Sequence, residues 1–318
     1  MPTILIASLQ PAEGRTTVAA GLAACLVEAG RAVRVARVRA PEGADAPAED
    51  DAGALVGVPG GTSSGRAVTE QDALSQAKEA AGASALLIIE AQPGAPNDLA
   101  ARLGARVILV SSAPDDLSLG EAATAASSLG PSLLGMVLTR QPERRLPAAR
   151  SLLDRRSVRC LAALPEDRLL AGPSVRELAE ALHASRLVVG EREDEAVEYV
   201  MLGPISADPG QPYFLQHGSK AVVNRFDRMD LHLAALATEP DCLVLTGGQT
   251  PSAYHLDRVA GGEPGVTVLL SPEDTVRTVE LLDGLYGRTR FSGQRKIARA
   301  IELFRSQFNS SEFEAALG

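Results

Sequence analysis

The sequence predicts an α/β protein with a doubly wound, mostly parallel β-sheet, followed by a smaller α/β domain. Short apolar runs alternate along the chain with stretches whose apolar residues recur at helical spacing, which is the pattern of successive β-α-β units. Most of these runs are apolar throughout, as expected for parallel strands that helices cover on both faces. At 318 residues, the chain is long enough for two domains.

In the first domain, the pattern predicts strands joined by helices. Strands are expected at 4–7, 32–38, 85–90, 106–110, 133–138 and 160–165. Helices are expected after Gly14 and at 70–81, 117–128, 147–155 and 175–182. Residues 41–66 are rich in Pro, Gly, Ala and acidic residues, which predicts a long loop of the kind that commonly covers an active site.

The charged run GEREDEAVE, within residues 186–200, predicts a solvated linker between the domains. We therefore expect a boundary near residue 190, with domains at 1–190 and 191–318. Strands of the second domain are expected at 199–204, 221–223, 242–245 and 266–270.

Two acidic residues of the second domain, Asp227 and Asp274, precede helical patterns and are expected to cap those helices. The last pattern, at 294–308, places four apolar side chains on one helical face. This face would pack on its own domain or form a dimer contact.

Composition excludes several classes of protein. The net charge of −9, without a basic stripe, argues against nucleic-acid binding. No apolar run approaches membrane-spanning length and no signal peptide is recognisable, so we expect a cytoplasmic protein without membrane contact. The three cysteines lie far apart in apolar runs and are expected to be buried free thiols. The four histidines lack ligand spacing, and a surface position is expected for His232.

The stretch from Thr3 to Glu28 has the order strand, glycine-containing loop, helix, which is a phosphate-binding arrangement because the first N–H groups of a helix attract anions. A complete P-loop closes with Gly-Lys-Ser/Thr. Here the triplet is Gly14-Arg15-Thr16, followed by Thr17. Arginine keeps the positive charge but differs from lysine in shape, so phosphate binding is favoured over phosphoryl transfer. The alternative is an α/β protein whose first turn merely contains Gly-Arg-Thr.

An acidic residue, Glu90, ends the apolar run ALLIIE. Ligands of parallel sheets bind at the carboxyl edge, so this side chain is placed to reach phosphates or their metal ion. The alternative is a solvated carboxylate at a strand end.

Several further segments resemble a known architecture: LIIEAQPG (87–94), NDLA (97–100), LLGMVLTR (133–140), ALPEDRLLAGPSVRELAEAL (163–182), DRMDLHLAAL (227–236) and LVLTGGQTPS (243–252). With the N-terminal strand-loop-helix, they resemble the P-loop group of dethiobiotin synthetase and cobyrinic acid amidotransferase (BioD/CobQ-like), followed by a DRTGG domain. This is the order found in the N-terminal, non-catalytic region of long bacterial phosphotransacetylases, and the likeness spans nearly the whole chain.

The resemblance implies a nucleotide site that binds ATP or another nucleotide with Mg²⁺. Gly14, Thr16 and Thr17 match the phosphate loop, with Arg15 in place of its lysine. The other implied positions are Arg37 for a second lysine, Glu90 and Asp51 (or Asp50) with Thr16 as metal ligands, and Thr139 for an adenine-contacting asparagine.

In the second domain, Asp227, Arg228 and Asp230 match the family's Asp-Arg-x-Asp, and Thr246-Gly247-Gly248 match its Thr-Gly-Gly. The resemblance links such domains to regulation and dimer contacts. An arginine between two acids is more often a structural ion-pair cluster or an interface than a ligand site.

Three functional hypotheses follow. The first is a regulatory nucleotide-binding protein with a degenerate P-loop, which forms homodimers and signals to a partner such as a separate phosphotransacetylase or another acetyl-CoA enzyme. The second is a Mg²⁺-dependent, ATP-using ligase or weak ATPase of the dethiobiotin synthetase/cobyrinic acid synthase type. The third is a scaffold without a ligand. A phosphotransacetylase itself is not expected, because the sequence given ends before a catalytic domain, and no catalytic nucleophile set is recognisable.

Overall fold

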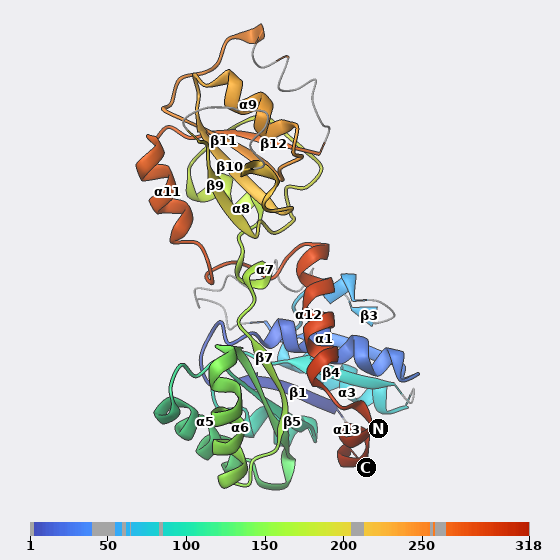
Figure 1. Ribbon diagram of the computed structural model, residues 1–318. Helices are drawn as coiled ribbons and strands as arrows, with labels where there is room; N and C mark the ends of the chain where they lie inside the picture. The colour runs from blue at the N-terminus through green and yellow to red at the C-terminus, as the bar shows by residue number, and fades with distance from the viewer. Residues whose placement is uncertain are drawn as a thin grey trace. The chain divides into compact units, whose positions relative to one another are not determined.

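The computed structural model describes residues 3–39, 55–58, 62–63, 65–82, 85–204, 213–254, 257 and 265–317. The chain divides into two compact units, Met1–Asp167 with Ile297–Gly318, and Arg168–Lys296 (Figure 1). The boundary expected near residue 190 thus falls inside the second unit. The last part of the chain belongs to the first unit.

The first unit contains a seven-stranded sheet in the order β3-β2-β4-β1-β5-β6-β7, and its strand pairs are parallel. The strands are β1 (Thr3–Ser8), β2 (Val33–Arg37), β3 (Thr62–Ser63), β4 (Leu86–Glu90), β5 (Arg106–Ser111), β6 (Leu133–Gln141) and β7 (Cys160–Pro165). The predicted α/β class and parallel sheet are confirmed. The short edge strand β3 lies within the predicted loop 41–66.

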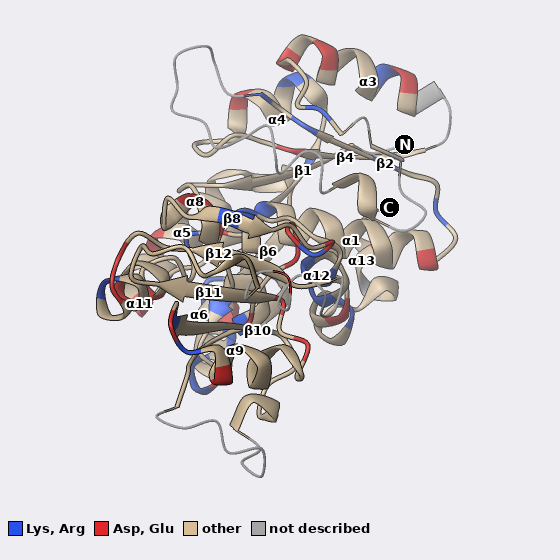
Figure 2. Cartoon of the chain, turned by 90° about the horizontal axis from the view of Figure 1, so that it is seen from above, with Lys and Arg blue, Asp and Glu red and all other residues tan. Residues whose placement is uncertain are grey.

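Helices cover both faces of this sheet. They are α1 (Arg15–Glu28), α3 (Glu70–Gly82), α4 (Asn97–Leu103), α5 (Asp116–Ser128), α6 (Leu146–Arg155), α12 (Gln294–Gln307) and α13 (Ser310–Leu317). Short 3₁₀ turns lie at η1 (Leu55–Gly57), η2 (Gly130–Ser132) and η3 (Glu143–Arg145). Charged residues of both signs gather on helices such as α3 (Figure 2). No helix in the described ranges is long and apolar enough to cross a membrane.

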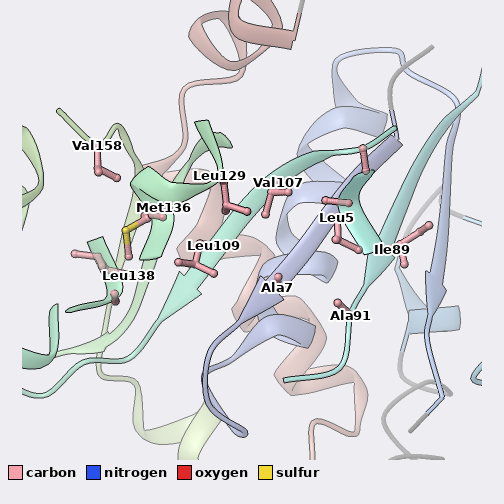
Figure 3. Packing of buried hydrophobic residues seen from close by; sticks show 14 of the residues in the cluster. Leu5, Ala7, Ile89, Ala91, Val107, Leu109, Leu129, Met136, Leu138 and Val158 are labelled. Carbon is pink, nitrogen blue, oxygen red and sulfur yellow. The ribbon is translucent and has the colours of Figure 1, made fainter. Parts of the chain in front are cut away.

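Strand β1 shows how the core is divided. Leu5 and Ala7 join the cluster formed with α3 to α6 (Figure 3), whereas the equally buried Ile4 and Ile6 point to the opposite face. Helix α1 contacts β1, β2 and β4. A Cβ added at Gly21 of α1 would lie 2.4 Å from Cβ of Phe304 in α12, so the two helices are in direct contact there. The apolar face predicted at 294–308 therefore packs on the first unit.

The second unit has a five-stranded sheet in the order β8-β12-β11-β10-β9, in which β8 is an antiparallel edge strand. The strands are β8 (Ser185–Val188), β9 (Tyr199–Leu202), β10 (Lys220–Arg225), β11 (Cys242–Thr246) and β12 (Thr267–Leu270). The helices are α7 (Arg168–Ala171), α8 (Val175–Ala181), α9 (Met229–Leu236) and α11 (Thr275–Asp283), with a 3₁₀ turn η4 (Tyr213–Leu215). Separate apolar clusters lie on the two faces of this sheet.

The segment predicted as a linker, 186–200, is part of the second unit. It contains most of β8 and the start of β9. Two of its acids are paired with arginines, since Glu193 accepts a 2.8 Å hydrogen bond from Arg186, and Asp194 accepts one of 2.8 Å from Arg176. The charge run is therefore a folded connection and not a free linker.

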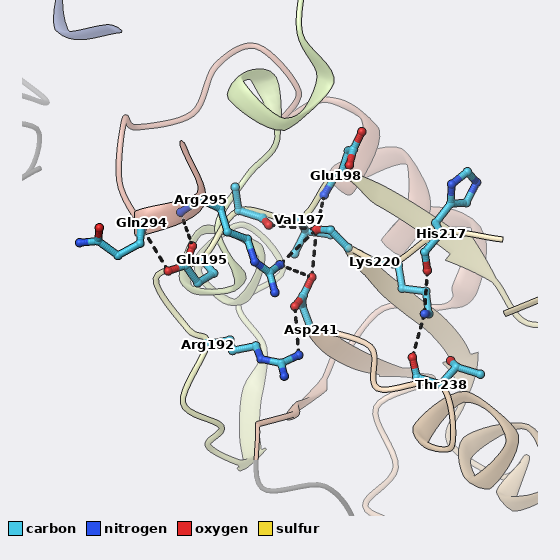
Figure 4. A network of polar contacts seen from close by, with 12 residues as sticks. Arg192, Glu195, Val197, Glu198, His217, Lys220, Thr238, Asp241, Gln294 and Arg295 are labelled. Carbon is cyan, nitrogen blue, oxygen red and sulfur yellow. Dashed lines mark hydrogen bonds and ion pairs between the residues drawn. The ribbon is translucent and has the colours of Figure 1, made fainter. Parts of the chain in front are cut away.

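A buried carboxylate, Asp241, organises the polar interior near the start of α12 (Figure 4). It accepts a 2.8 Å hydrogen bond from Arg295 and a 3.0 Å bond from Ser219, and lies 3.5 Å from Arg192. Glu195 accepts the backbone N–H groups of Gln294 and Arg295, each at 3.0 Å. Residues of the predicted linker thus hold the first turn of α12.

Of the two predicted helix caps, Asp274 is confirmed and Asp227 is wrong. Asp274 caps α11 as predicted, because it accepts the N–H of Arg277 at 2.8 Å. Asp227 does not cap α9. The N-cap position is Arg228, and Asp227 pairs with Arg225 at 2.8 Å instead.

The predicted free state of the cysteines is confirmed, whereas the predicted surface position of His232 is wrong. The three cysteines are free, as predicted, although Cys160 is only half-buried. His232, expected at the surface, is fully buried, and its Nε2 lies 2.8 Å from the carbonyl oxygen of Arg225.

Candidate phosphate-binding site

The candidate site lies at the carboxyl edge of the first sheet, where β1, β2 and β4 are neighbours. Glu90, the last residue of β4, is the register partner of Ile6 in β1 and of Arg37 in β2. The loop after β1 leads directly into α1. The sheet register thus brings residues distant in sequence to the first turn of that helix.

Gly14 makes the turn into α1 possible. Its φ of 85° lies in the left-handed region that favours glycine. A Cβ added there would lie 3.3 Å from Cγ2 of Thr139, so space is restricted as well. The hydroxyl of Thr139 is buried and donates a 2.7 Å hydrogen bond to the carbonyl oxygen of Glu13. Thr139 therefore fixes the loop.

Arg15 turns toward the sheet. Its side chain is 8% exposed, and Nη1 donates to the carbonyl oxygen of Ala91, the residue after β4. Its Nε lies 4.0 Å from Oε1 of Glu90. The guanidinium that replaces the P-loop lysine is thus held by groups at the end of β4.

Two more groups, from Thr16 and Arg37, lie close to the same oxygen, Oε1 of Glu90. Thr16 donates its hydroxyl to Oε1 of Glu90 at 3.0 Å. Nη1 of Arg37 lies 3.4 Å from that oxygen and also donates to Oγ1 of Thr16 at 3.4 Å. Glu90 is 1% exposed, so it is a buried, paired carboxylate and not a solvated strand end.

Sequence reasoning missed one residue of the loop, Glu13. Its side chain is 8% exposed and accepts the backbone N–H groups of Gln10 at 3.0 Å and Ser112 at 3.1 Å. The carboxylate therefore occupies one backbone N–H of the loop after β1 and one of the segment after β5. Backbone N–H groups of the first loop are the kind of donor that binds phosphate in P-loops. An acid before the glycine was visible in the sequence, but nothing there showed that its side chain folds back into the loop.

The other predicted site residues of the first unit are not among the contacts described above. Thr17 is half-buried on α1. Asp50 and Asp51 lie outside the described residues, as does most of the predicted loop 41–66.

The arrangement of Thr16 and Arg37 around Oε1 of Glu90 does not fit a Mg²⁺ ion. Mg²⁺ requires oxygen ligands in near-octahedral geometry at about 2.0–2.1 Å. Of the three predicted ligands, Asp51 lies outside the described residues, and Thr16 and Glu90 are hydrogen-bonded to each other. The guanidinium of Arg37 lies 3.4 Å from both of these oxygen atoms. Within the described ranges, no group of three or more His, Cys, Asp or Glu side chains is arranged to hold a metal ion.

In the second unit, the Asp-Arg-x-Asp residues lie on the surface at the start of α9. Arg228 forms a two-pronged pair with Asp230, at 2.7 and 3.0 Å, and Arg225 forms a similar pair with Asp227, at 2.8 and 3.1 Å. The neighbouring Arg228 lowers the pKa of Asp230. These pairs are open to solvent, which screens them, so they contribute little to stability.

Thr246-Gly247-Gly248 has a structural role. The N–H groups of Gly247 and Gly248 donate to the carbonyl oxygens of Glu273 at 2.8 Å and Ser271 at 3.1 Å. Oγ1 of Thr246 lies 2.7 Å from Oγ1 of Thr275. This segment thus joins the end of β11 to the turn between β12 and α11, while the Asp-Arg-x-Asp residues remain at the surface.

Comparison with known proteins identifies a domain and a curated relative. Residues 177–285, inside the second unit, match the DRTGG domain. The chain is 32% identical over 165 residues to a phosphate acetyltransferase from Nitratidesulfovibrio vulgaris, a match that covers 48% of this chain and 23% of that protein. The chain thus spans less than a quarter of the length of this relative.

Two solved structures show weaker similarities, with TM-scores below 0.5. The CBS and DRTGG domains of a Clostridium perfringens pyrophosphatase, complexed with diadenosine tetraphosphate, have 14% identity and a TM-score of 0.31, over 47% of this chain and 73% of that one. Cobyrinic acid a,c-diamide synthase from Mycobacterium smegmatis, with bound ADP and magnesium, has 17% identity and a TM-score of 0.34, over 52% and 87%. Structural similarity at this level gives no information about the ligands of this chain.

The domain match and the sequence relationship agree with the expected architecture. The second unit contains a DRTGG domain, and the chain is related to part of a phosphate acetyltransferase.

Proposed function

We propose that this protein is a nucleotide-binding regulatory protein, in which the first unit binds the phosphates of a nucleotide and the DRTGG domain forms a regulatory or dimer contact. One observation carries the proposal. Arg15, Thr16 and Arg37 converge on the carboxylate of Glu90 beside the first turn of α1. The proposed ligand is ATP or another nucleotide.

The electrostatics of this position favour an anion. Helix α1 extends over 14 residues, and its first turn leaves backbone N–H groups that attract phosphate oxygens. Arg15 begins the helix and donates to a neutral carbonyl oxygen. A phosphate oxygen is a stronger acceptor than a carbonyl, so the guanidinium gains by turning toward a bound phosphate.

The residues of this site favour nucleotide binding over phosphoryl transfer. Phosphoryl transfer by P-loop enzymes depends on a lysine and on Mg²⁺ held by a hydroxyl and a carboxylate. Here the lysine position is Arg15, and the described hydroxyl and carboxylate bond to each other. These features favour a nucleotide sensor over the alternative of an ATP-using ligase.

In this proposal, the DRTGG domain provides the surface that contacts another protein chain. Its Asp-Arg-x-Asp residues are exposed and contribute little to stability, so a role in contacts with another chain accounts for them better. The proposed partner is a second copy of the chain or a separate metabolic enzyme that uses acetyl-CoA.

Calorimetric titration with ATP, ADP, GTP and AMP tests the nucleotide proposal. Binding to the wild-type protein is expected to be lost or strongly weakened in Arg15→Ala. The matched control is Arg34→Ala, which removes an exposed arginine of β2 that lies 3.9 Å from Glu79. If none of the four nucleotides binds to the folded protein, or if both variants behave alike, the proposal is wrong.

A further inference from the structure

We propose that the phosphates bind in this site without a divalent cation, and that the guanidinium groups of Arg15 and Arg37 take its place. This inference rests on the proposed function and concerns the form of the ligand, which would be a metal-free polyphosphate. It departs from the Mg²⁺ dependence that the sequence resemblance implies.

The first step of the argument is the crowding around Oε1 of Glu90. This one oxygen lies 3.0 Å from the hydroxyl of Thr16, 3.4 Å from Nη1 of Arg37 and 4.0 Å from Nε of Arg15. A metal ion bound to this oxygen would have to enter between two guanidinium groups. Arginine stays protonated in proteins, so neither group can lose its charge to admit the ion.

The second step concerns the hydroxyl of Thr16. A metal ligand must direct an oxygen lone pair at the ion. Here the hydroxyl donates its proton to Glu90, while its oxygen accepts a hydrogen bond from Arg37 at 3.4 Å. The proton and one of the two oxygen lone pairs are thus engaged within the protein. A Mg²⁺ ion at the remaining lone pair would lie beside the positively charged guanidinium of Arg37, which contacts the same oxygen.

The third step is burial. Arg15, Arg37 and Glu90 are each at most 8% exposed, so water and salt screen their charges weakly. Repulsion between a dication and each guanidinium is therefore strong, and so is attraction between each guanidinium and a phosphate. The same geometry that disfavours Mg²⁺ favours the anion.

The other described carboxylate of the loop does not replace Glu90 as a metal ligand. The two oxygens of Glu13 accept the N–H groups of Gln10 and Ser112, which directs them toward backbone donors. Within the described ranges, no set of three acidic, histidine or cysteine side chains forms a metal site.

The first test is calorimetric titration of the full-length protein with ATP and with inorganic tripolyphosphate, in EDTA and in excess Mg²⁺. We expect both probes to bind in EDTA, and Mg²⁺ to leave the affinity unchanged or to weaken it by up to about tenfold, because the metal complex is less anionic. Binding that requires Mg²⁺, or that Mg²⁺ tightens by about tenfold or more, overturns the inference. Binding of neither probe in either buffer refutes the proposed function, and the inference with it.

A second test reads the metal directly and needs no nucleotide. Mn²⁺ serves as the probe, with bound and free ion distinguished by electron paramagnetic resonance. We expect no Mn²⁺ bound to the wild-type protein or to the control Arg34→Gln at millimolar concentration. We expect measurable binding to Arg37→Gln, which uncovers Thr16 and Glu90. Mn²⁺ bound by the wild-type protein and lost in Glu90→Gln overturns the inference, even where nucleotide binding is intact.

Discussion

Arg37 and Glu90 are register partners on the adjacent parallel strands β2 and β4, and their side chains meet at the edge of the sheet, with Nη1 3.4 Å from Oε1. Each group offsets part of the buried charge of the other. The pair therefore supports the fold as well as the proposed phosphate site.

Replacing Arg37 with methionine is expected to destabilise the first unit by about 3–5 kcal/mol, because a buried carboxylate loses a charged partner. Thermal unfolding followed by circular dichroism measures the effect, with Arg34→Met as the exposed control. The double variant Arg37→Met/Glu90→Met should recover much of the loss. A single variant as stable as the wild type would contradict the proposed pairing.

Replacing Glu13 with glutamine should raise the affinity for ATP by about tenfold, because the negative charge beside the first turn of α1 is removed and the N–H of Gln10 no longer binds a carboxylate. The side chain keeps one oxygen that can accept the N–H of Gln10 or Ser112, so the loop should stay folded. The matched control is Glu121→Gln on α5. Calorimetry gives the two affinities, and unchanged or weaker binding by Glu13→Gln would show that this carboxylate does not compete with phosphate.

Gly21→Ala should destabilise the first unit by about 1–3 kcal/mol, as expected for overpacking of a buried contact. The added Cβ would lie 2.4 Å from Cβ of Phe304, so α1 and α12 would have to move apart. Gly218→Ala is the control, since a Cβ there meets no atom within 4 Å. Equal melting temperatures for Gly21→Ala and the wild type would argue against the docking of α12 on α1.

The thiols should react slowly with Ellman's reagent in the native protein at pH 8. Burial raises the pKa of Cys25 to about 11 and also raises the pKa values of Cys160 and Cys242. Only the thiolate reacts, so the rate at Cys25 should rise about tenfold per pH unit below its pKa. Three thiols should become reactive on denaturation, and fast reaction of Cys25 in the native protein would contradict this burial.

Arg228→Ala should leave the melting temperature close to that of the wild type, since solvent screens the pair with Asp230. We expect it to weaken self-association, measured by light scattering on a size-exclusion column. Arg277→Ala removes another exposed pair, with Glu280, and is the control. A wild-type protein that is monomeric, or an Arg228→Ala protein that associates normally, counts against the dimer contact.

The sequence was most informative where burial alone determines structure. The apolar runs that became β1, β4 and β11 could be predicted because strands covered on both faces leave a continuous apolar signal. The edge strand β8 could not, since it is short, antiparallel and next to a charged run. Helix α12 was predicted as amphipathic, but a periodic face does not specify which unit it packs against.

The candidate site could be predicted in composition but not in arrangement. The loop position of Arg15 and the strand-end position of Glu90 predicted that these two residues would lie near one sheet edge, and the family resemblance added Arg37. The direction of Arg15 and the inward turn of Glu13 depend on side-chain rotamers and on contacts with Ala91 and Ser112, which no local pattern encodes. The burial of His232 likewise follows from its contact with the carbonyl oxygen of Arg225.

The most direct test of the account is titration of ATP into the wild-type protein and into Arg15→Ala, both in EDTA. We predict saturable binding to the wild type, and loss of at least about tenfold in affinity in the variant, because Arg15 supplies one of the two charges that hold the phosphates. Absence of binding to the folded wild-type protein, or equal affinity for both proteins, would contradict the account.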